Sequence, residues 1–296
     1  MRPVFVTLLI LGMATGLSAK SPTAEPRLVA LKALNSDVGT ELRARAADVV
    51  LIAPRESVTE QAGKIGLSLG TSSGLCDTQP FADERGVDMA CTGVLVSTGL
   101  VLTAAHCLDH RDIEDWVVVF GHHGHAKVSL RSARIKAIRH CVPNDERGDL
   151  VALELEEALE PASPAQLAAP QRGDRVHLLG HPFGWTLKAS TCIGLRHCDN
   201  YPTATEIGVD WFLADLDAFG GNSGSPVYSA DGKSLVGIWS GGPTMLERSD
   251  PKVRTSCKIY PTSSGKSWGG KATRVDKFMA SVTTGTSLNN QCRKAP

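Results

Sequence analysis

From about residue 65 onward, the apolar residues of this chain come in short runs separated by Gly, Pro, Asn and Asp. Such runs between turn-forming residues are typical of β-strands, whereas a helix needs a longer stretch with helical spacing. The 29 glycines and 16 prolines also favour a turn-rich β fold over a helical bundle. Many short strands at this spacing predict an all-β sandwich or barrel architecture. The expected strands cover residues 93–96, 100–103, 116–120, 135–138, 150–154, 175–179, 212–214, 225–228 and 235–239.

The two ends of the chain follow other patterns. Residues 273–282 place Val275, Phe278, Met279 and Val282 at helical spacing, which predicts a short C-terminal helix. Residues 20–64 are rich in Ala, Arg and Glu, lack cysteine and contain helix-like pieces over 28–34 and 41–52. We interpret residues 20–64 as a pro-segment or N-terminal extension that precedes a domain over residues 65–296.

The first residues predict export. Arg2 precedes an apolar stretch over residues 4–17 that has the size of a secretory signal, and small residues follow up to Ala19. We therefore expect a signal peptide over residues 1–19. No second stretch is long enough to span a bilayer, so we expect a soluble monomer without a membrane anchor, either secreted or periplasmic. The 31 basic and 31 acidic side chains balance, which argues against a nucleic-acid partner.

In an exported chain, the eight cysteines are expected to form disulfides. The favoured bridge joins Cys91 to Cys107, because it would tie the strand that holds Cys91 beside a histidine of interest, His106. A small loop between Cys192 and Cys198 is the next choice. The cysteines that remain predict the pairs Cys76–Cys141 and Cys257–Cys292.

Three motifs in the order His, Asp, Ser carry the chemistry of this sequence. Thr103-Ala104-Ala105-His106-Cys107 comes first, and Gly221-Asn222-Ser223-Gly224-Ser225-Pro226 follows about a hundred residues later. Between them, Asp149 opens the apolar run of residues 150–155, which would hold its carboxylate rigidly. Asp145 is the nearby alternative, but no comparable apolar run follows it.

These residue types suit nucleophilic acyl transfer. A serine hydroxyl needs a neutral imidazole to take its proton, and a buried carboxylate selects the imidazole tautomer and stabilises the imidazolium. We therefore expect Ser223 to be the nucleophile, His106 the base and Asp149 its orienting group. The oxyanion would bind to the backbone N–H groups of Gly221 and Ser223.

From about Cys91 to the C-terminal helix, these motifs resemble the chymotrypsin/trypsin family of serine proteases. The Ser-Gly-Ser-Pro string after Gly-Gly-Asn is most similar to the bacterial branch, which includes the glutamyl endopeptidases. The resemblance implies two six-stranded antiparallel β-barrels with the active site between them, His106 and Asp149 in the first and Ser223 in the second. It implies a secreted serine endopeptidase that acts on protein or peptide substrates and needs neither cofactor nor metal.

The sequence departs from the family pattern at three positions. Asn222 stands where animal trypsins carry an aspartate that pairs with a newly freed N-terminus, although Lys64-Ile65 lies near a position suited to zymogen processing. Phe219 replaces a cysteine of a pocket disulfide. Trp239 stands about where glutamyl endopeptidases have the histidine that recognises a substrate carboxylate.

The resemblance places Asp217, Ser240 and Gly241 in the substrate-binding pocket. An aspartate six residues before the nucleophile lies at the pocket floor of trypsin-like enzymes, so Asp217 predicts cleavage after Arg or Lys. Alternatively, Asp217 is a turn residue that bonds local N–H groups. The sequence is also compatible with selectivity for Glu or for small residues, and with a catalytically silent binding protein.

Two further histidine features have structural interpretations. The cluster His122, His123 and His125 is interpreted as a solvated loop rather than a metal site, and His181 as part of a turn.

Overall fold

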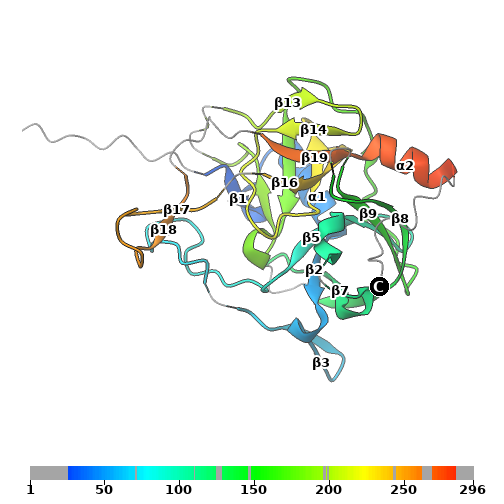
Figure 1. The fold of residues 1–296 in the computed structure, drawn as a ribbon, viewed down its shortest axis with the longest axis horizontal. Helices are drawn as coiled ribbons and strands as arrows, with labels where there is room; N and C mark the ends of the chain where they lie inside the picture. The colour runs from blue at the N-terminus through cyan, green and yellow to red at the C-terminus, as the bar shows by residue number, and fades with distance from the viewer. Residues whose placement is uncertain are drawn as a thin grey trace, which may run out of the picture.

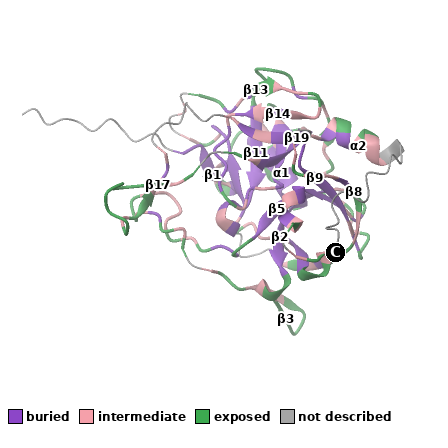
Figure 2. Ribbon diagram, in the orientation of Figure 1, coloured by how far each residue is buried: buried purple, intermediate pink, exposed green. Residues whose placement is uncertain are grey.

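The computed structural model describes residues 26–70, 72–109, 111–124, 129–145, 148–195, 198, 200–242, 245–261 and 269–284. The expected signal peptide over residues 1–19 lies outside the described residues. Two β-sheets lie side by side at the centre of the molecule, with helix α2 (Val275–Thr284) at one end and the short hairpin of β17 (Glu247–Arg248) and β18 (Lys258–Ile259) at the other (Figure 1). Buried residues concentrate in the strands of both sheets (Figure 2). The expected all-β class with a short C-terminal helix is confirmed.

The first sheet is a closed barrel of six antiparallel strands. Side chains that alternate along its strands fill the interior, including Val50, Ile52, Val101, Val118 and Val151, which are all buried. In order around the barrel, the strands are β2 (Val49–Pro54), β5 (Cys91–Ser97), β6 (Leu100–Thr103), β9 (Leu150–Leu155), β8 (Arg131–Val142) and β7 (Trp116–Phe120).

The second sheet has nine strands and is open, where six strands in a closed barrel were expected. Its curvature nevertheless brings the start of β11 (Val176–Gly180) to the start of β13 (Ala204–Ile207), where an isolated antiparallel bridge joins Arg175 to Thr203. β10 (Gln166–Leu167) pairs with β16 (Ser234–Gly241) beside the main path. Along that path, the strands are β1 (Leu28–Ala30), β12 (Lys188–Ser190), β11 (Val176–Gly180), β15 (Pro226–Ser229), β16 (Ser234–Gly241), β19 (Gly270–Arg274), β14 (Trp211–Ala214) and β13 (Ala204–Ile207).

Residues 28–54 belong to both sheets, so the boundary expected at residue 65 does not separate two structural units. β1 pairs with β12 of the open sheet, and β2 closes the barrel. Between them, Ser36 caps the N-terminus of α1 (Asp37–Arg45), because its hydroxyl accepts a hydrogen bond from the Gly39 N–H at 3.1 Å. The helix ends at Arg45, and part of the expected helix over 41–52 is strand β2 because its Val-Val-Leu-Ile run is buried on both faces.

A hydrophobic core joins the two sheets, and the N-terminal part supplies some of it. Leu34 and Leu42 are fully buried in one cluster with Leu102 and Leu150 of the barrel and Tyr228 of the open sheet. Burying a leucine side chain stabilises the fold by about 1.5–3 kcal/mol. The segment before residue 65 is therefore a structural part of the same core. Helix α2 adds Val275 and Phe278 to this cluster.

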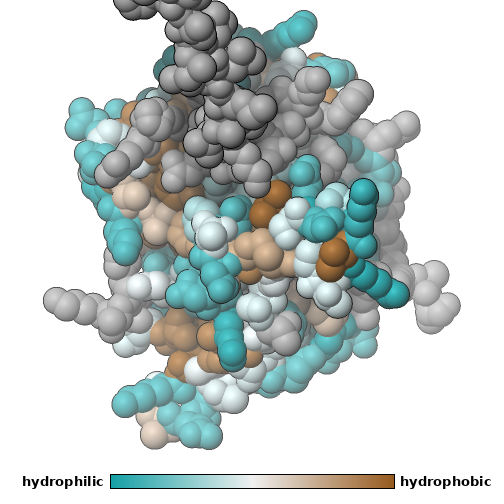
Figure 3. Space-filling model, turned by 90° about the vertical axis from the view of Figure 1, so that its left-hand side faces the viewer, coloured by the Kyte–Doolittle hydropathy of each residue, from teal (hydrophilic) through white to brown (hydrophobic). Residues whose placement is uncertain are grey.

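The remaining elements lie at the surface. β3 (Val58–Gln61) and β4 (Lys64–Leu67) form a hairpin that projects from the barrel (Figure 1). Short 3₁₀ helices cover Leu31–Ala33, Ala46–Asp48, Arg55–Ser57, Ala105–Leu108, Ile113–Asp115 and Pro182–Gly184. Within the described ranges, no helix has the length and apolar character needed to cross a membrane. On the face shown in Figure 3, apolar residues form separate small patches among hydrophilic ones.

The disulfides correct part of the expected pairing. Cys91–Cys107 and Cys192–Cys198 form as expected. Cys76 pairs with Cys257, so its expected bridge to Cys141 is wrong, as is the bridge of Cys257 to Cys292. The reason is a parallel bridge between Leu75 and Lys258, which brings the two segments together although they are far apart in sequence. Cys141 is also disulfide-bonded, and Cys292 lies outside the described residues.

Candidate active site

Adjacent strands of the barrel bring His106 and Asp149 together. β6 and β9 pair so that the last residue of β6, Thr103, lies opposite Val151 near the start of β9. His106 follows β6 and Asp149 precedes β9, so both lie at the same edge of the barrel. The His106 Nδ1 lies 2.5 Å from Asp149 Oδ2, and the His106 backbone N–H donates to Asp149 Oδ1 at 3.0 Å. The carboxylate of Asp149 is fully buried, and its backbone N–H donates to Thr273 Oγ1 of the open sheet at 2.9 Å. The residue that contacts the His106 imidazole is therefore Asp149, as the sequence predicted.

Asp149 also controls the charge state of the imidazole. Burial alone would lower the pKa of His106, but the hydrogen bond to Asp149 and the negative charge of its carboxylate outweigh burial and raise that pKa above 6.5. The bond at Nδ1 directs the other nitrogen toward Ser223, and His106 Nε2 lies 2.8 Å from Ser223 Oγ. The three residues thus form one continuous hydrogen-bonded line.

Glycine is required on both sides of Ser223. Gly221 and Gly224 have φ values of 90° and 85°, in the region that favours glycine. A Cβ at Gly221 would lie 2.4 Å from the carbonyl oxygen of His181, and one at Gly224 would lie 2.0 Å from that of Thr92. These close approaches create the tight turn that presents the Ser223 hydroxyl, which also lies 3.4 Å from the carbonyl oxygen of Ser240.

Hydrogen bonds fix the direction of the two N–H groups expected to bind an oxyanion. The carbonyl of Gly220 accepts from the Phe183 N–H at 2.5 Å, and that of Asn222 accepts from the Ser225 N–H at 2.9 Å. In a planar trans peptide, the N–H points away from the carbonyl oxygen of the same peptide group. The N–H groups of Gly221 and Ser223 therefore point away from Phe183 and Ser225. Among the described residues, no backbone or side-chain acceptor contacts either N–H.

Thr92 joins the nucleophile turn to the barrel. Its backbone N–H donates to the Ser223 carbonyl and its hydroxyl donates to the Gly221 carbonyl, both at 2.8 Å. The same hydroxyl accepts from the His181 N–H at 3.0 Å. The Thr92 carbonyl in turn accepts from the Thr103 hydroxyl at 2.6 Å. Neither Thr92 nor Thr273 was predicted from the sequence, because their roles depend on contacts between segments that no local motif marks.

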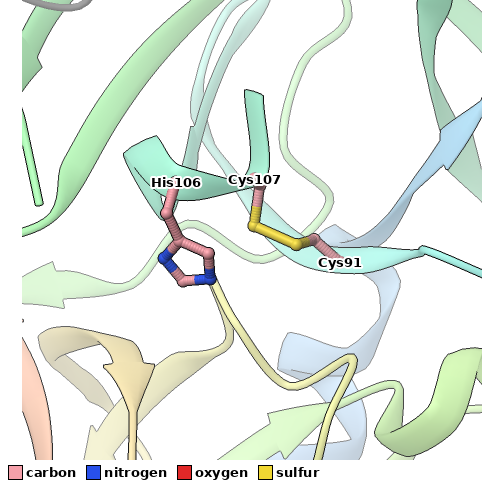
Figure 4. Close-up of side chains that lie close together, drawn as sticks. All are labelled: Cys91, His106 and Cys107. Atoms are coloured by element: carbon pink, nitrogen blue, oxygen red, sulfur yellow. A yellow bond between two sulfur atoms is a disulfide. The ribbon is translucent and has the colours of Figure 1, made fainter. Parts of the chain in front are cut away.

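The disulfide of Cys91 and Cys107 lies beside this site. His106 and Cys107 come from the same short helix, and the bridge leads to Cys91 on β5 (Figure 4). These three side chains lie close enough together to suggest a metal site. The disulfide occupies both sulfurs, however, so the cluster offers no thiolate ligand.

The pocket residues implied by the family resemblance have different surroundings. Ser240 and Gly241 end β16 beside Ser223, and apart from the neighbouring residues in sequence, no heavy atom lies within 4 Å of a Cβ built on Gly241. Asp217 is instead buried, and both oxygens of its carboxylate contact Arg27. The negative charge that selectivity for Arg or Lys requires is thus already compensated within the chain.

The three departures from the family pattern are buried. Asn222 is fully buried, and its Oδ1 accepts from Ser225 Oγ at 3.4 Å. Phe219 packs against Phe183 and Tyr260, with ring centroids 5.6 and 5.3 Å away. Trp239 is buried in the core of the open sheet.

Two histidines outside the catalytic line, His122 and His181, pack together. His181 is fully buried, and His122 stacks on it with ring centroids 5.4 Å apart. His122 Nε2 also lies 3.2 Å from the Gly184 carbonyl, so His122 is packed against the turn rather than fully solvated. His125 lies outside the described residues.

Comparisons with known proteins identify a family and a fold for this chain. A family model for a trypsin-like peptidase domain matches residues 91–238, half of the chain. Among solved structures, an inactivated protease paralogue of the scabies mite is similar, with a TM-score of 0.50 and 13% sequence identity. The match covers 83% of this chain and 94% of the mite protein, and at this identity it shows the fold alone. No curated protein sequence matches the chain.

Proposed function

Because the chain belongs to the trypsin-like peptidase family, we propose that it is a serine endopeptidase that hydrolyses peptide bonds through an acyl-enzyme. The observation that carries the proposal is the line from Asp149 through His106 to Ser223, with contacts of 2.5 and 2.8 Å. A serine that merely stabilised the turn would not need an imidazole held in this tautomer by a buried carboxylate.

The geometry accounts for each proton transfer. Ser223 Oγ attacks the substrate carbonyl carbon while His106 Nε2 takes the hydroxyl proton, and the N–H groups of Gly221 and Ser223 bind the oxyanion. When the intermediate collapses, His106 donates that proton to the leaving amine. A water then attacks the acyl-enzyme, with His106 as base, and releases the acid and free Ser223. Asp149 accepts the Nδ1–H bond throughout.

We also propose that the protein works as a secreted or periplasmic monomer on protein or peptide substrates. Its disulfides support export, since such bridges persist in oxidising compartments. The N-terminal residues support it too, because Arg2 and the apolar stretch after it have the composition of a signal peptide.

A catalytically silent binding protein is the second candidate. The fold is compatible with it, because a protein described as an inactivated protease paralogue has a similar fold. The hydrogen-bonded triad favours the enzyme, because all three groups are present and in contact.

A labelling and cleavage experiment decides between these two functions. The exported protein is treated with a fluorophosphonate and digested with a mixed peptide library, beside Ser223→Ala. We expect labelling and new peptide termini that are both absent from the variant. A folded wild-type protein that neither labels nor cleaves would overturn the proposal and favour the binding protein.

A further inference from the structure

Arg27 is a buried arginine beside the segment that leads to the nucleophile. Its side chain is 5% exposed, and that of Asp217 is 11% exposed. Arg27 Nη2 donates to Asp217 Oδ1 at 2.7 Å, and the Arg27 backbone N–H donates to Asp217 Oδ2, also at 2.7 Å. Nη1 and Nη2 contact Asp215 at 3.3 and 2.9 Å, and Nη1 donates to the Asn200 carbonyl at 3.1 Å. One residue thus engages both carboxylates.

Hydrogen bonds join three segments here: Arg27 just before β1, the end of β12 at Ser190, and the segment of Asp217. The Thr191 N–H donates to the Arg27 carbonyl at 2.8 Å, and Leu28 pairs with Ser190 in the β1–β12 ladder. The Asp217 N–H donates to Ser190 Oγ at 3.0 Å. Asp217 is therefore held through its backbone by β12 and through its side chain by Arg27. Only five residues separate it from Ser223.

The charge of Asp217 is already satisfied in its buried surroundings. Burial alone would lower the pKa of Arg27, but its hydrogen bonds to Asp215 and Asp217 raise that pKa, so the guanidinium stays charged. A buried carboxylate needs a cation, and Arg27 supplies it. A substrate Arg or Lys in the same place would bring a second positive charge close to Arg27, so it would gain less from Asp217 than from a carboxylate without a counter-ion.

We infer that Arg27 is the counter-ion of Asp217. Through this ion pair, Arg27 positions the segment before Ser223 and makes the protease cleave after uncharged residues. The inference rests on the proposed peptidase function and names the substrate class of the same site. Arg27 is a positioning and specificity-determining residue, since it acts through Asp217 and not on the reacting atoms. Selectivity for glutamate lacks support as well, because the position of the family's carboxylate-binding histidine is occupied by the buried Trp239.

The first test measures the buried pair without requiring activity. In a Ser223→Ala background, Arg27→Gln and Asp217→Asn are combined in a double-mutant cycle of urea unfolding. A buried pair predicts a coupling of at least about tenfold in the unfolding equilibrium constant. The matched control is the exposed pair Arg131 and Glu157, with side chains 57% and 51% exposed, whose glutamine variants should couple less than about fivefold. Equal coupling of the two pairs would overturn the counter-ion.

If Arg27→Gln does not fold, the test compares the urea unfolding of Arg27→Lys with that of Asp217→Asn. Arg27→Lys retains the charge but loses the contact of two guanidinium nitrogens with Asp215, so it should unfold at a lower urea concentration than wild type and at a higher one than Asp217→Asn. An Arg27→Lys variant no more stable than Asp217→Asn would contradict a role for the charge.

The second test reads selectivity in proteins that retain Ser223. Mass spectrometry of peptide-library digests identifies the residue on the acyl side of each cut, and a fluorophosphonate counts the active sites. For wild type, we expect cuts after uncharged residues, and the same preference in Asp217→Asn. Arg27→Gln leaves Asp217 uncompensated, so the share of cuts after Arg and Lys should rise at least several-fold per active site.

The outcomes separate the two proposals. Wild-type cuts after Arg and Lys that disappear in Asp217→Asn would overturn the counter-ion inference and leave the peptidase intact. A shift in selectivity in Arg131→Gln equal to that in Arg27→Gln would also overturn it. Absence of labelling and cleavage in wild type would instead defeat the peptidase, and the unfolding cycle would still test the pair.

Discussion

The Thr92 hydroxyl holds the turn that carries the nucleophile, and Thr92→Val removes this contact with little change in shape. Thr92 is fully buried, and its Oγ1 accepts from the His181 N–H and donates to the Gly221 carbonyl. Valine places a methyl group there, so two buried backbone groups lose their partner. Each unpartnered group costs about 1–3 kcal/mol, which predicts a loss of about 2–6 kcal/mol in the free energy of unfolding for the two groups together. For a chain of this size, Tm should fall by roughly 5–15 °C.

The same substitution should slow catalysis. The Gly221 carbonyl, once released, no longer restrains the backbone that presents the oxyanion N–H groups, so kcat should fall about 10- to 100-fold with a smaller change in KM. Thr92→Ser keeps the hydroxyl and is the matched control. Stability is measured by thermal unfolding in the Ser223→Ala background, and kcat by peptide cleavage with active-site titration. A valine variant as stable and as active as the serine variant would refute the role of this hydroxyl.

Two further predictions concern titratable groups. Asp149→Asn should lower kcat about 10⁴-fold, because it favours the wrong imidazole tautomer. In wild type, the raised pKa of His106 predicts that kcat/KM rises with pH along a limb centred above pH 6.5, and this limb should move to lower pH in Asp149→Asn; equal midpoints would contradict the argument. Burial, followed by the proximity of His122, holds the pKa of His181 well below 6.5. Below about pH 6.5, the His181 imidazole therefore binds a proton in the unfolded chain but stays neutral in the folded one. The free energy of unfolding should fall as pH decreases below about 6.5. Urea unfolding of Ser223→Ala across about pH 5–8 measures this slope, and the same slope in a His181→Gln variant would show that His181 is not its source.

The three residues of the candidate triad could be singled out in the sequence because each carries a local signal. His106 follows a strand and precedes a cysteine, Asp149 opens an apolar run, and Ser223 lies between glycines. The order of the three motifs identified the fold class, and the structure brings their side chains into contact. The bridge of Cys91 to Cys107 was predictable for the same reason, since it adjoins His106.

Other features depend on which distant segments meet. The Val-Val-Leu-Ile run of β2 resembled the end of a helix, yet it closes the barrel because β5 and β7 offer pairing edges on both sides. The bridge of Cys76 to Cys257 depends on a contact across 181 residues, which spacing does not reveal.

The sequence by itself determined the β-rich class and pointed to the residues of the candidate triad, because backbone periodicity and residue type are local properties. The tertiary structure decided the electrostatics around Asp217. Asp217 has the sequence position of a substrate-binding anion, but its effective charge depends on Arg27, 190 residues away. A carboxylate attracts a substrate cation only when the fold leaves it uncompensated, and that depends on which buried groups pack around it.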